Sequence, residues 1–235
     1  MRFGYLNLKN HPRGNIILQN LLSSGLIPSI IIEEDSTLAA KNYNSIASYF
    51  DKNTFANTSD IIRNYNIPLI EVKNHNDLDC ENILKEQKLD LIVLGDTRII
   101  KNNIMSLPEI GIINSHPGYL PDVRGNNPYI WALIHDLPQG CSVHFIDENI
   151  DTGDLILREE IEIKNFKSYP ALLNKINDLC AKLIVEAVRK INTGDYQRIP
   201  QSMIKPVNPK HQIREFLAAS DDIKKQAIKK LESIS

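Results

Sequence analysis

The chain has 235 residues, 42% of them hydrophobic, which is enough to bury a full core in one large domain or in one domain with an appendage. The formal net charge of -2 and a pI near 6.3 provide no broad attraction for nucleic acid or for anionic lipid. The N-terminus lacks the apolar core of a signal peptide and no run of about 18 apolar residues occurs. We therefore expect a globular cytoplasmic protein without a membrane segment and without a nucleic-acid partner.

The three cysteines, Cys80, Cys141 and Cys180, are far apart in the sequence and stand outside any C-x-x-C pattern. Their odd number and spacing predict neither a disulfide framework nor a zinc site. A reducing compartment fits this cysteine usage, and we expect a protein that needs no metal.

The first half of the chain alternates short apolar runs with longer amphipathic stretches. The runs predict buried strands and begin at Phe3, Ile27, Ile67, Leu89 and Ile110. The stretches that begin at Gly14, Ser36 and Asn76 have helical spacing, and each is long enough for a crossover between parallel strands. This alternation predicts an α/β fold with a Rossmann-like, mostly parallel open sheet and flanking helices.

The pattern changes after Gly125. A helix is expected over residues 126–136, and two strands that begin at Cys141 and Leu155 predict a hairpin that need not be parallel to the sheet. A long amphipathic helix is predicted from a cap at Ser168 to a stop at Gly194.

Beyond Gly194 a proline-punctuated link leads to two short helical pieces around Phe216 and Ile228. We therefore predict one domain over residues 1–194 and a small C-terminal helical appendage over residues 195–235.

Polar residues gather where the fifth apolar run ends, in the stretch I-N-S-H-P-G. Ligands of open α/β sheets usually bind beyond the carboxyl ends of the strands. Asn114 and His116 are two residues apart, so their side chains lean the same way in an extended chain. Further on, the turn D-E-N-I-D-T-G-D places Asp147, Asp151 and Asp154 close together, where a carboxylate could hold a histidine or bind a polar ring.

Four motifs occur in a characteristic order: N-x-H, L-P-x-x-R-G, G-C-S-V-H-F and I-D-T-G-D. In this order and spacing, from about Leu91 to Ile163, the chain resembles the folate-dependent formyltransferases. This family includes glycinamide ribonucleotide transformylase, methionyl-tRNA formyltransferase and the nucleotide-sugar N-formyltransferases. The resemblance implies the formyltransferase fold and 10-formyltetrahydrofolate as the formyl donor.

Carried over by position, the resemblance implies that Asn114, His116 and Asp151 are catalytic. A substrate amine would attack the formyl carbon, and preorganised donors aimed at the formyl oxygen would stabilise the charge that grows there. The amide of Asn114 and a protonated His116 supply such donors, while Asp151 can orient the imidazole or steer a water that carries protons.

The resemblance also implies a set of ligand-binding residues. The backbone of the segment L-G-D-T-R-I-I is expected to bind the pterin, and the cofactor-binding set is Gly95, Arg98, Ile99, Ile100 and Asp147. For the acceptor we expect Arg13, at a helix N-terminus suited to phosphate, and Tyr119, Arg124, Gly125, Asn127 and Trp131 in the loop and helix after His116.

Other residues have simpler interpretations. Packing is preferred over substrate contact for Tyr129 and Trp131, His144 is interpreted as a packed strand residue, and His135 as a partner of a helix C-terminus. Lys205, Lys210 and His211 near the prolines could hold a pyrophosphate, although surface exposure explains them as well.

Elimination narrows the acceptor amine. The first loop, Y-L-N-L-K-N-H-P-R-G-N, departs from the glycine-rich G-x-G-S-N loop of glycinamide ribonucleotide transformylases. The residues after Gly194 are too few for the C-terminal barrel of methionyl-tRNA formyltransferases, and the overall charge does not suit tRNA. A nucleotide-linked amino sugar, such as a dTDP-linked dideoxy amino hexose used in lipopolysaccharide O-antigen biosynthesis, is left as the expected small-molecule partner.

Three alternatives stay open, one within the transferase class and two from other classes. They are transfer to another small amine such as glycinamide ribonucleotide, hydrolysis of the formyl donor, and a catalytically silent folate-binding protein. Consumption of 10-formyltetrahydrofolate without added amine would separate a hydrolase from a transferase. A homodimer is a further expectation.

Overall fold

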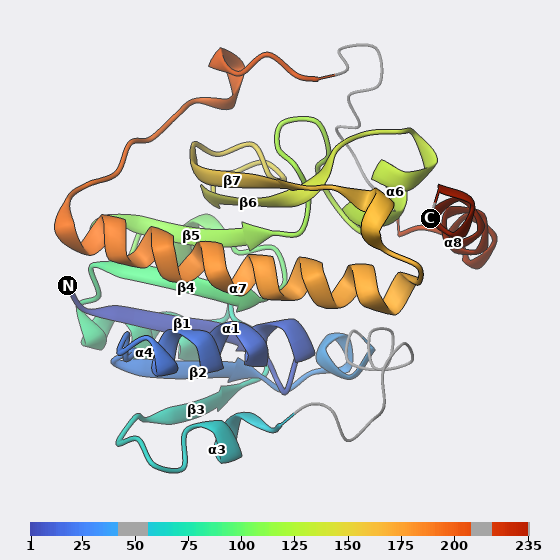
Figure 1. The fold of residues 1–235 in the computed structure, drawn as a ribbon. Coiled ribbons are helices and arrows are strands. Elements are labelled where there is room, and N and C mark those ends of the chain that lie inside the picture. Colours follow the sequence, from blue (N-terminus) through green and yellow to red (C-terminus); the bar gives the residue numbers. More distant parts are fainter. Residues whose placement is uncertain (42–55, 208–217, 235) are drawn as a thin grey trace. The chain divides into compact units, whose positions relative to one another are not determined.

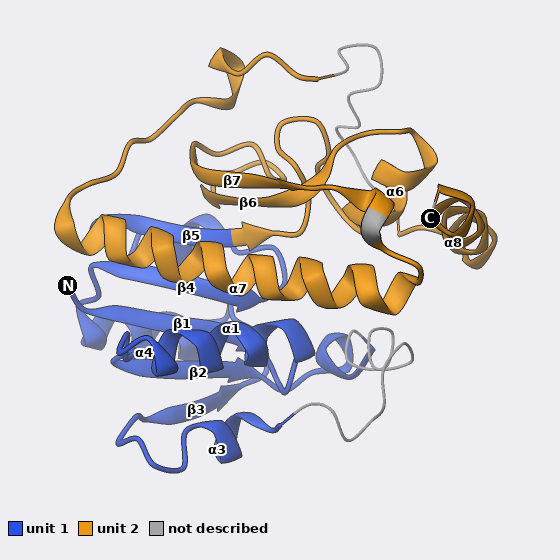
Figure 2. Ribbon diagram, viewed as in Figure 1, with its two compact units in different colours: residues 1–114 blue, residues 115–235 orange. Residues whose placement is uncertain are grey.

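The computed structural model describes residues 1–41, 56–207 and 218–234 (Figure 1). The contacts divide the chain into two compact units, residues 1–114 and residues 115–235 (Figure 2). This division falls within one strand, β5 (Gly111–His116). The expected domain boundary between residues 194 and 195 concerns a different part of the chain and stays a prediction.

Parallel strands form the first unit. β1 (Phe3–Leu8), β2 (Ile30–Glu34), β3 (Leu69–Val72) and β4 (Leu91–Asp96) precede β5 in the chain. Their order in the sheet is β3-β2-β1-β4-β5, and each strand pairs in parallel with its neighbours in this order. Each strand overlaps one of the five predicted apolar runs, which confirms the mostly parallel α/β prediction. The apolar runs are continuous because parallel strands are covered on both faces.

Helices of the first unit follow the predicted stretches, with additions. α1 (Pro12–Ser23) packs on β4, and α4 (Leu78–Gln87) begins where the Asp77 carboxylate accepts from the Cys80 N–H. The four-residue helices α3 (Thr58–Ile61) and α5 (Asn102–Met105) were not predicted. Residues 37–41 are helical, and the remainder of the helix expected after Ser36 lies outside the described residues.

The end of β5 differs from the sequence expectation, which ended this strand at Asn114. The strand continues through Ser115 and His116, and both of these residues are buried. The Ser115 hydroxyl donates to the Cys180 carbonyl, so a polar side chain can stay in this extended, buried stretch. His116 is therefore a strand residue rather than a loop residue.

The second unit is built on a hairpin and a long helix. β6 (Gln139–Phe145) pairs antiparallel with β7 (Leu155–Ile161), as expected. α7 (Tyr169–Thr193) packs on both strands; its cap is the Ser168 hydroxyl, and it stops at Gly194, which has a φ of 76°. α6 (Pro128–Ile134) and the short turn η1 (Ile163–Asn165) complete the part before the link.

The segment after α7 is tied into the second unit. Ile199 forms an antiparallel bridge with Leu155 through two backbone hydrogen bonds of 2.9 Å. The turn η2 (Gln201–Met203) follows, and α8 (Asp221–Ile234) packs on α6 with Ala227 and Leu231 buried. The helix expected around Ile228 is confirmed, whereas the piece around Phe216 lies outside the described residues, as do Lys210 and His211.

The three cysteines are buried thiols. Burial raises the pKa of Cys80 to about 12, so this thiol is unreactive at neutral pH. Cys141 and Cys180, far apart in the sequence, bring their Sγ atoms to 3.3 Å. Among the described residues, no helix is both long and apolar enough to span a bilayer.

Candidate active site

A carboxylate between two imidazoles marks the candidate site in the second unit. The distance from His116 Nδ1 to Asp151 Oδ2 is 3.4 Å, and that from His144 Nε2 to Asp151 Oδ1 is 3.5 Å. His116 comes from the end of β5, His144 from β6, and Asp151 from the turn between β6 and β7. The two rings are perpendicular, with centroids 6.4 Å apart, and both histidines are buried.

The far side of each ring also meets an oxygen acceptor. His116 Nε2 lies 3.0 Å from the Val123 carbonyl, and His144 Nδ1 lies 2.8 Å from the Phe145 carbonyl. A neutral imidazole has one N–H and one bare nitrogen, whereas carbonyl and carboxylate oxygens only accept. Each ring therefore lies between two oxygen acceptors.

Asp151 is held as an anion. Burial alone would raise the pKa of its carboxyl group, but the positive charge of His116, the contact with His144 and the N–H of Gly125 together hold that pKa well below its ordinary value. The Gly125 N–H donates to Asp151 Oδ2 at 2.7 Å. The carboxylate can therefore orient His116 and stabilise its cation at neutral pH.

The turn that carries Asp151 has demanding backbone geometry. Asp151 itself has a φ of 53°, in the left-handed region that non-glycine residues rarely adopt. A Cβ on Gly153 would approach the Phe145 carbonyl to 1.9 Å, so only glycine fits beside the end of β6. The I-D-T-G-D motif is thus explained by the tight return of the chain onto β6.

Asn114, the third predicted catalytic residue, lies in β5 opposite Leu94 of β4 and is the last residue of the first unit. The structure brings His116 and Asp151 together as expected from the motifs. The contribution of Asn114 stays a prediction.

The segment expected to bind the pterin is fixed by side chains of the first unit. Arg98 donates two hydrogen bonds of 2.5 Å, from Nε and Nη2, to the buried carboxylate of Glu34. Asn76 binds the backbone on both sides: its amide donates to the Ile99 carbonyl at 2.9 Å and accepts from the Lys101 N–H at 2.8 Å. The Ile99 side chain is 70% exposed. These contacts hold the backbone of the segment in place, and its binding to a pterin stays a prediction.

Two other predicted cofactor residues have structural explanations. A Cβ on Gly95 would come within 2.0 Å of the Tyr5 hydroxyl, so close packing inside the first unit accounts for this glycine. The exposed Asp147 carboxylate accepts from the Thr152 hydroxyl at 2.6 Å and from the Asn149 N–H at 3.1 Å, which closes the turn around Asp151. Direct contact of either residue with a folate stays a prediction.

The predicted acceptor residues are separated in the fold. Arg13 belongs to the first unit and pairs with Asp96, so its charge is compensated. The Arg158 guanidinium lies 4.4 Å from the centroid of the Tyr119 ring, on its face. Trp131 packs against Val123 and Leu137 and stacks on His135 at 6.0 Å. Packing, preferred for Trp131 in the sequence interpretation, is what the structure shows.

The other acceptor candidates surround Asp151. Gly125 binds the Asp151 carboxylate, and Arg124 Nη2 donates to Gln201 Oε1 at 2.8 Å. The Asn127 side chain accepts from the Ala219 N–H at 3.1 Å, which connects the start of α6 with the start of α8. Two residues of the predicted acceptor set, Arg124 and Gly125, therefore lie beside the candidate catalytic turn within this unit.

A cavity of about 550 Å³ lies beside this turn, within the second unit. Arg124, Thr152 and Asp154 line one part of it, and the segment after α7 lines the other with Gln201 and Ser202. It is large enough for part of a small-molecule ligand.

The strand position and burial of His144 agree with the sequence interpretation, but two contacts of this cluster were not predicted. His144 was interpreted as a packed strand residue, yet its ring shares the Asp151 carboxylate. Gln201, from the link after α7, is 5% exposed and binds the backbone of the Asp151 turn. His144 belongs to the motif G-C-S-V-H-F, but the motif does not show which carboxylate its ring meets, and the contact of Gln201 depends on how a distant segment packs.

Comparison with known proteins places these features in a family. Residues 36–188 match the formyl transferase family. Methionyl-tRNA formyltransferase from Syntrophus aciditrophicus is 34% identical over 139 residues, which are 58% of this chain and 45% of that protein. The enzyme of the same name from Kosmotoga olearia is 33% identical over 143 residues, or 60% and 46% of the two chains. The chain thus spans about half the length of the curated relatives it matches.

Solved structures share the fold at low sequence identity. Phosphoribosylglycinamide formyltransferase from Anaplasma phagocytophilum aligns with a TM-score of 0.66 and 18% identity, covering 90% of this chain and 97% of that one. A sugar N-formyltransferase from Shewanella sp. aligns with a TM-score of 0.60 and 19% identity, covering 85% and 73%. With the matched region, which contains His116, His144 and Asp151, these findings show that the chain belongs to the formyl transferase family.

Proposed function

We propose that the protein transfers the formyl group of 10-formyltetrahydrofolate to the amine of a nucleotide-linked amino sugar, giving an N-formyl sugar and tetrahydrofolate. The observation that carries the proposal is the partly buried Asp151 carboxylate between His116 and His144 in a chain of the formyl transferase family. The proposal covers the activity, the acceptor and the donor, since the chain spans about half the length of the curated relatives.

The chemistry requires a donor aimed at the formyl oxygen. The amine nitrogen forms a bond to the formyl carbon, and the carbonyl electron pair moves to oxygen. When the C–N bond to the folate breaks, the folate nitrogen takes up a proton and the attacking nitrogen gives one up. Loss of one donor to the developing oxyanion typically lowers the rate about 10²–10³-fold, so donor placement dominates catalysis.

His116 and Asn114 are the proposed donors. Asp151 faces Nδ1 of His116, which leaves the Nε2 hydrogen to be donated on the other side of the ring. In this structure Nε2 faces the Val123 carbonyl, and the formyl oxygen would take the place of that carbonyl. Because side chains alternate along a strand, Asn114 and His116 project to the same face of β5.

The donor molecule supplies the formyl group, and the protein would hold it by its pterin. The backbone of Arg98, Ile99 and Ile100 is proposed to bind the ring, fixed in place by Glu34 and Asn76. Asp147 is proposed to add a polar contact. The chain itself provides binding, orientation and the proton-bearing groups.

A small-molecule acceptor is supported by the cavity beside the Asp151 turn, with Arg124 available to an anionic group such as a phosphate. The net charge of -2 also argues against tRNA as the acceptor. Methionyl-tRNA is nevertheless the second candidate acceptor, because the two curated relatives described above are methionyl-tRNA formyltransferases. A dTDP-linked sugar, a role in O-antigen biosynthesis, a cytoplasmic location and a homodimer are finer parts of the same proposal.

The test is a panel of acceptors incubated with 10-formyltetrahydrofolate and the protein. The panel contains dTDP- and UDP-linked amino sugars, glycinamide ribonucleotide, methionyl-tRNA and a sample without amine. Mass spectrometry should show one formyl group added to an amino sugar and to no other acceptor. Formylation of methionyl-tRNA or of glycinamide ribonucleotide alone would replace the proposed acceptor, and donor consumption without amine would indicate a hydrolase.

A further inference from the structure

We propose that Gln201 is a positioning residue that holds Asp151 in place for formyl transfer; this inference rests on the proposed function. Gln201 starts η2, in the segment after α7, where the sequence suggests a role for Lys205 but not for Gln201. Its side-chain amide donates to the Asp151 carbonyl at 2.9 Å and to the Gly153 carbonyl at 2.8 Å. Its side-chain oxygen accepts from Arg124 Nη2 at 2.8 Å.

Only a primary amide matches this set of partners. The two N–H groups of Gln201 meet two carbonyl oxygens, and its own carbonyl meets a guanidinium. A carboxylate at this position would keep the contact with Arg124 but would lose both donors. An apolar side chain of similar size would lose all three contacts and leave buried polar groups unpaired.

The contact matters because Asp151 has an unfavourable backbone conformation. Its φ of 53° lies in the left-handed region, which surrounding contacts must stabilise in a residue with a side chain. Gln201 binds the carbonyl of this same residue and the carbonyl two positions later. It therefore fixes the direction in which the Asp151 carboxylate leaves the backbone, toward His116 and His144.

Gln201 also connects this turn with the loop that faces it. Gly125 donates its N–H to the Asp151 carboxylate, and the preceding residue, Arg124, donates to Gln201. The Gln201 side chain thus links the turn that contains Asp151 with the loop that contains Arg124 and Gly125. Ile199 stands two residues before Gln201 in the chain, so its bridge to Leu155 holds Gln201 beside the Asp151 turn.

It follows that residues 199–203 belong to the candidate active site rather than to a separate appendage. Their contribution is to geometry, because Gln201 reaches the backbone of Asp151 and not the reacting atoms. A misplacement of about 1 Å can lower an enzymatic rate about 10²-fold, so a positioning residue can have a large effect on kcat.

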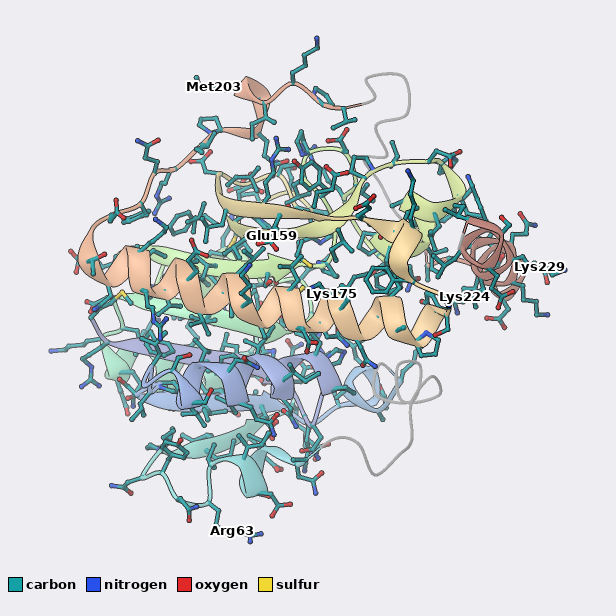
Figure 3. The ribbon with its side chains drawn as sticks, viewed as in Figure 1. Arg63, Glu159, Lys175, Met203, Lys224 and Lys229 are labelled. Carbon is teal, nitrogen blue, oxygen red and sulfur yellow. The ribbon has the colours of Figure 1, made fainter. Side chains whose placement is uncertain are left out.

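The test compares Gln201→Met, Gln201→Glu and Met203→Ala with the wild type. Methionine keeps the volume without the amide, and glutamate keeps the acceptor for Arg124 without the donors. Met203 is the control, because it lies in the same turn, is 78% exposed and projects from the segment after α7 (Figure 3). Steady-state formyl transfer should give kcat and KM for each variant over a range of pH, and the melting temperature should report folding.

We expect both Gln201 variants to lower kcat about 10²-fold while KM for 10-formyltetrahydrofolate stays within about twofold, and Met203→Ala to match the wild type. The alkaline limb of the kcat profile should also move to lower pH, since a displaced Asp151 stabilises the His116 cation less. A Gln201→Met protein with wild-type kcat and an unchanged pH profile would overturn the proposal.

A histidine side-chain NMR spectrum keeps this test separate from the proposed function. In ¹⁵N-labelled protein without substrates, Gln201→Met should shift the ring signals of His116 and His144, and Met203→Ala should not. If the wild type transfers formyl to no acceptor, the proposed function fails while the NMR comparison still decides the positioning role. Unchanged ring signals in a folded Gln201→Met or Gln201→Glu protein would contradict that role.

Discussion

Glu34 in the first unit is a buried carboxylate and Asp151 in the second is a partly buried one, and each lies 3.4 Å from a histidine Nδ1, that of His75 for Glu34 and that of His116 for Asp151. Glu34 binds Arg98 through two hydrogen bonds and also accepts from the Ser36 hydroxyl at 2.6 Å. Asp151 faces His116 and His144. Burial would raise the pKa of either carboxyl group, and in both the partners outweigh burial and lower it.

The difference lies in Arg98, whose guanidinium binds Glu34. A guanidinium stays charged at all physiological pH values, so the Glu34–Arg98 pair is permanent and fixes a backbone segment. An imidazole gains and loses its proton near neutral pH, so the pairs of Asp151 can take part in proton transfer. The pair with Arg98 thus gives Glu34 a positioning role, whereas the part that Asp151 takes in the chemistry is our proposal.

The largest effect on activity is expected at Asp151. Asp151→Asn keeps the size of the side chain but removes the anion that stabilises the His116 cation. We expect kcat for formyl transfer to fall about 10³-fold, within the usual range for loss of acid–base assistance. Thermal unfolding of the same protein should show that it folds. A variant with undiminished kcat would remove Asp151 from the mechanism and with it the contrast to Glu34.

Glu34→Gln should instead act on stability and folate binding. It leaves the Arg98 guanidinium without its buried anion, and breaking such a pair typically costs about 3–5 kcal/mol of unfolding free energy. We expect the unfolding free energy measured in urea to fall by this amount, and the KM for 10-formyltetrahydrofolate to rise.

The matched control is Arg63→Ala, which breaks the exposed pair of Arg63 with Asp60 on the outside of the first unit (Figure 3). Exposed pairs contribute about 1 kcal/mol or less, so this variant should stay close to the wild type. Equal effects of the two substitutions would show that the buried pair has no special role.

The pH dependence of stability should separate the two units as well. Burial, partly opposed by the nearby Asp96 carboxylate, lowers the pKa of His11 in the first unit to about 4. An unfolded histidine has a pKa of about 6.5, so neutral His11 supports the fold above that pH and loses about 3 kcal/mol of stability as pH falls from 6.5 to 4. Asp151 acts at lower pH, because its pKa is lowered below the ordinary value of about 3.9.

His11→Asn tests this assignment. The His11 side chain accepts from the Gly14 N–H at the start of α1, and asparagine preserves such a cap without titrating. Unfolding free energies measured between pH 7 and pH 4 should therefore change less steeply in the variant than in the wild type. Identical slopes would mean that His11 does not titrate on unfolding in this range.

The smallest effect is expected at His144, the second partner of Asp151. His144→Gln retains a hydrogen-bond donor but cannot carry a positive charge. We expect kcat to fall about tenfold, less than in Asp151→Asn, because His116 keeps its contact with the carboxylate. A loss as large as that of Asp151→Asn would make His144 an equal member of the catalytic pair.

The sequence predicts the regular part of the fold well. Five apolar runs predict the parallel strands because their burial on both faces leaves a continuous pattern, and α7 is recognised from its apolar face, the Ser168 cap and Gly194. The four-residue helices α3 and α5 are missed because one turn is too short to show a helical period.

The candidate site is predicted in part. His116 and Asp151 were found because they belong to motifs with a fixed order and spacing. The contact of His144 with Asp151, and that of Gln201 with the same turn, depend on how β6 and the segment after α7 fold back on the turn. The contact of Gln201 joins residues 50 positions apart, about which periodicity contains no information, whereas His144 stands in a quoted motif and only its partner was not predicted.

Transfer itself is tested most directly by following the formyl carbon. The protein should be incubated with 10-formyltetrahydrofolate labelled with ¹³C in the formyl group and with a nucleotide-linked amino sugar, and the label should be traced by NMR. Our account predicts that the label appears as a formamide on the sugar, and that Asp151→Asn slows its appearance about 10³-fold. Label released as formate whether or not the amine is present, or label that stays on the folate, would contradict it.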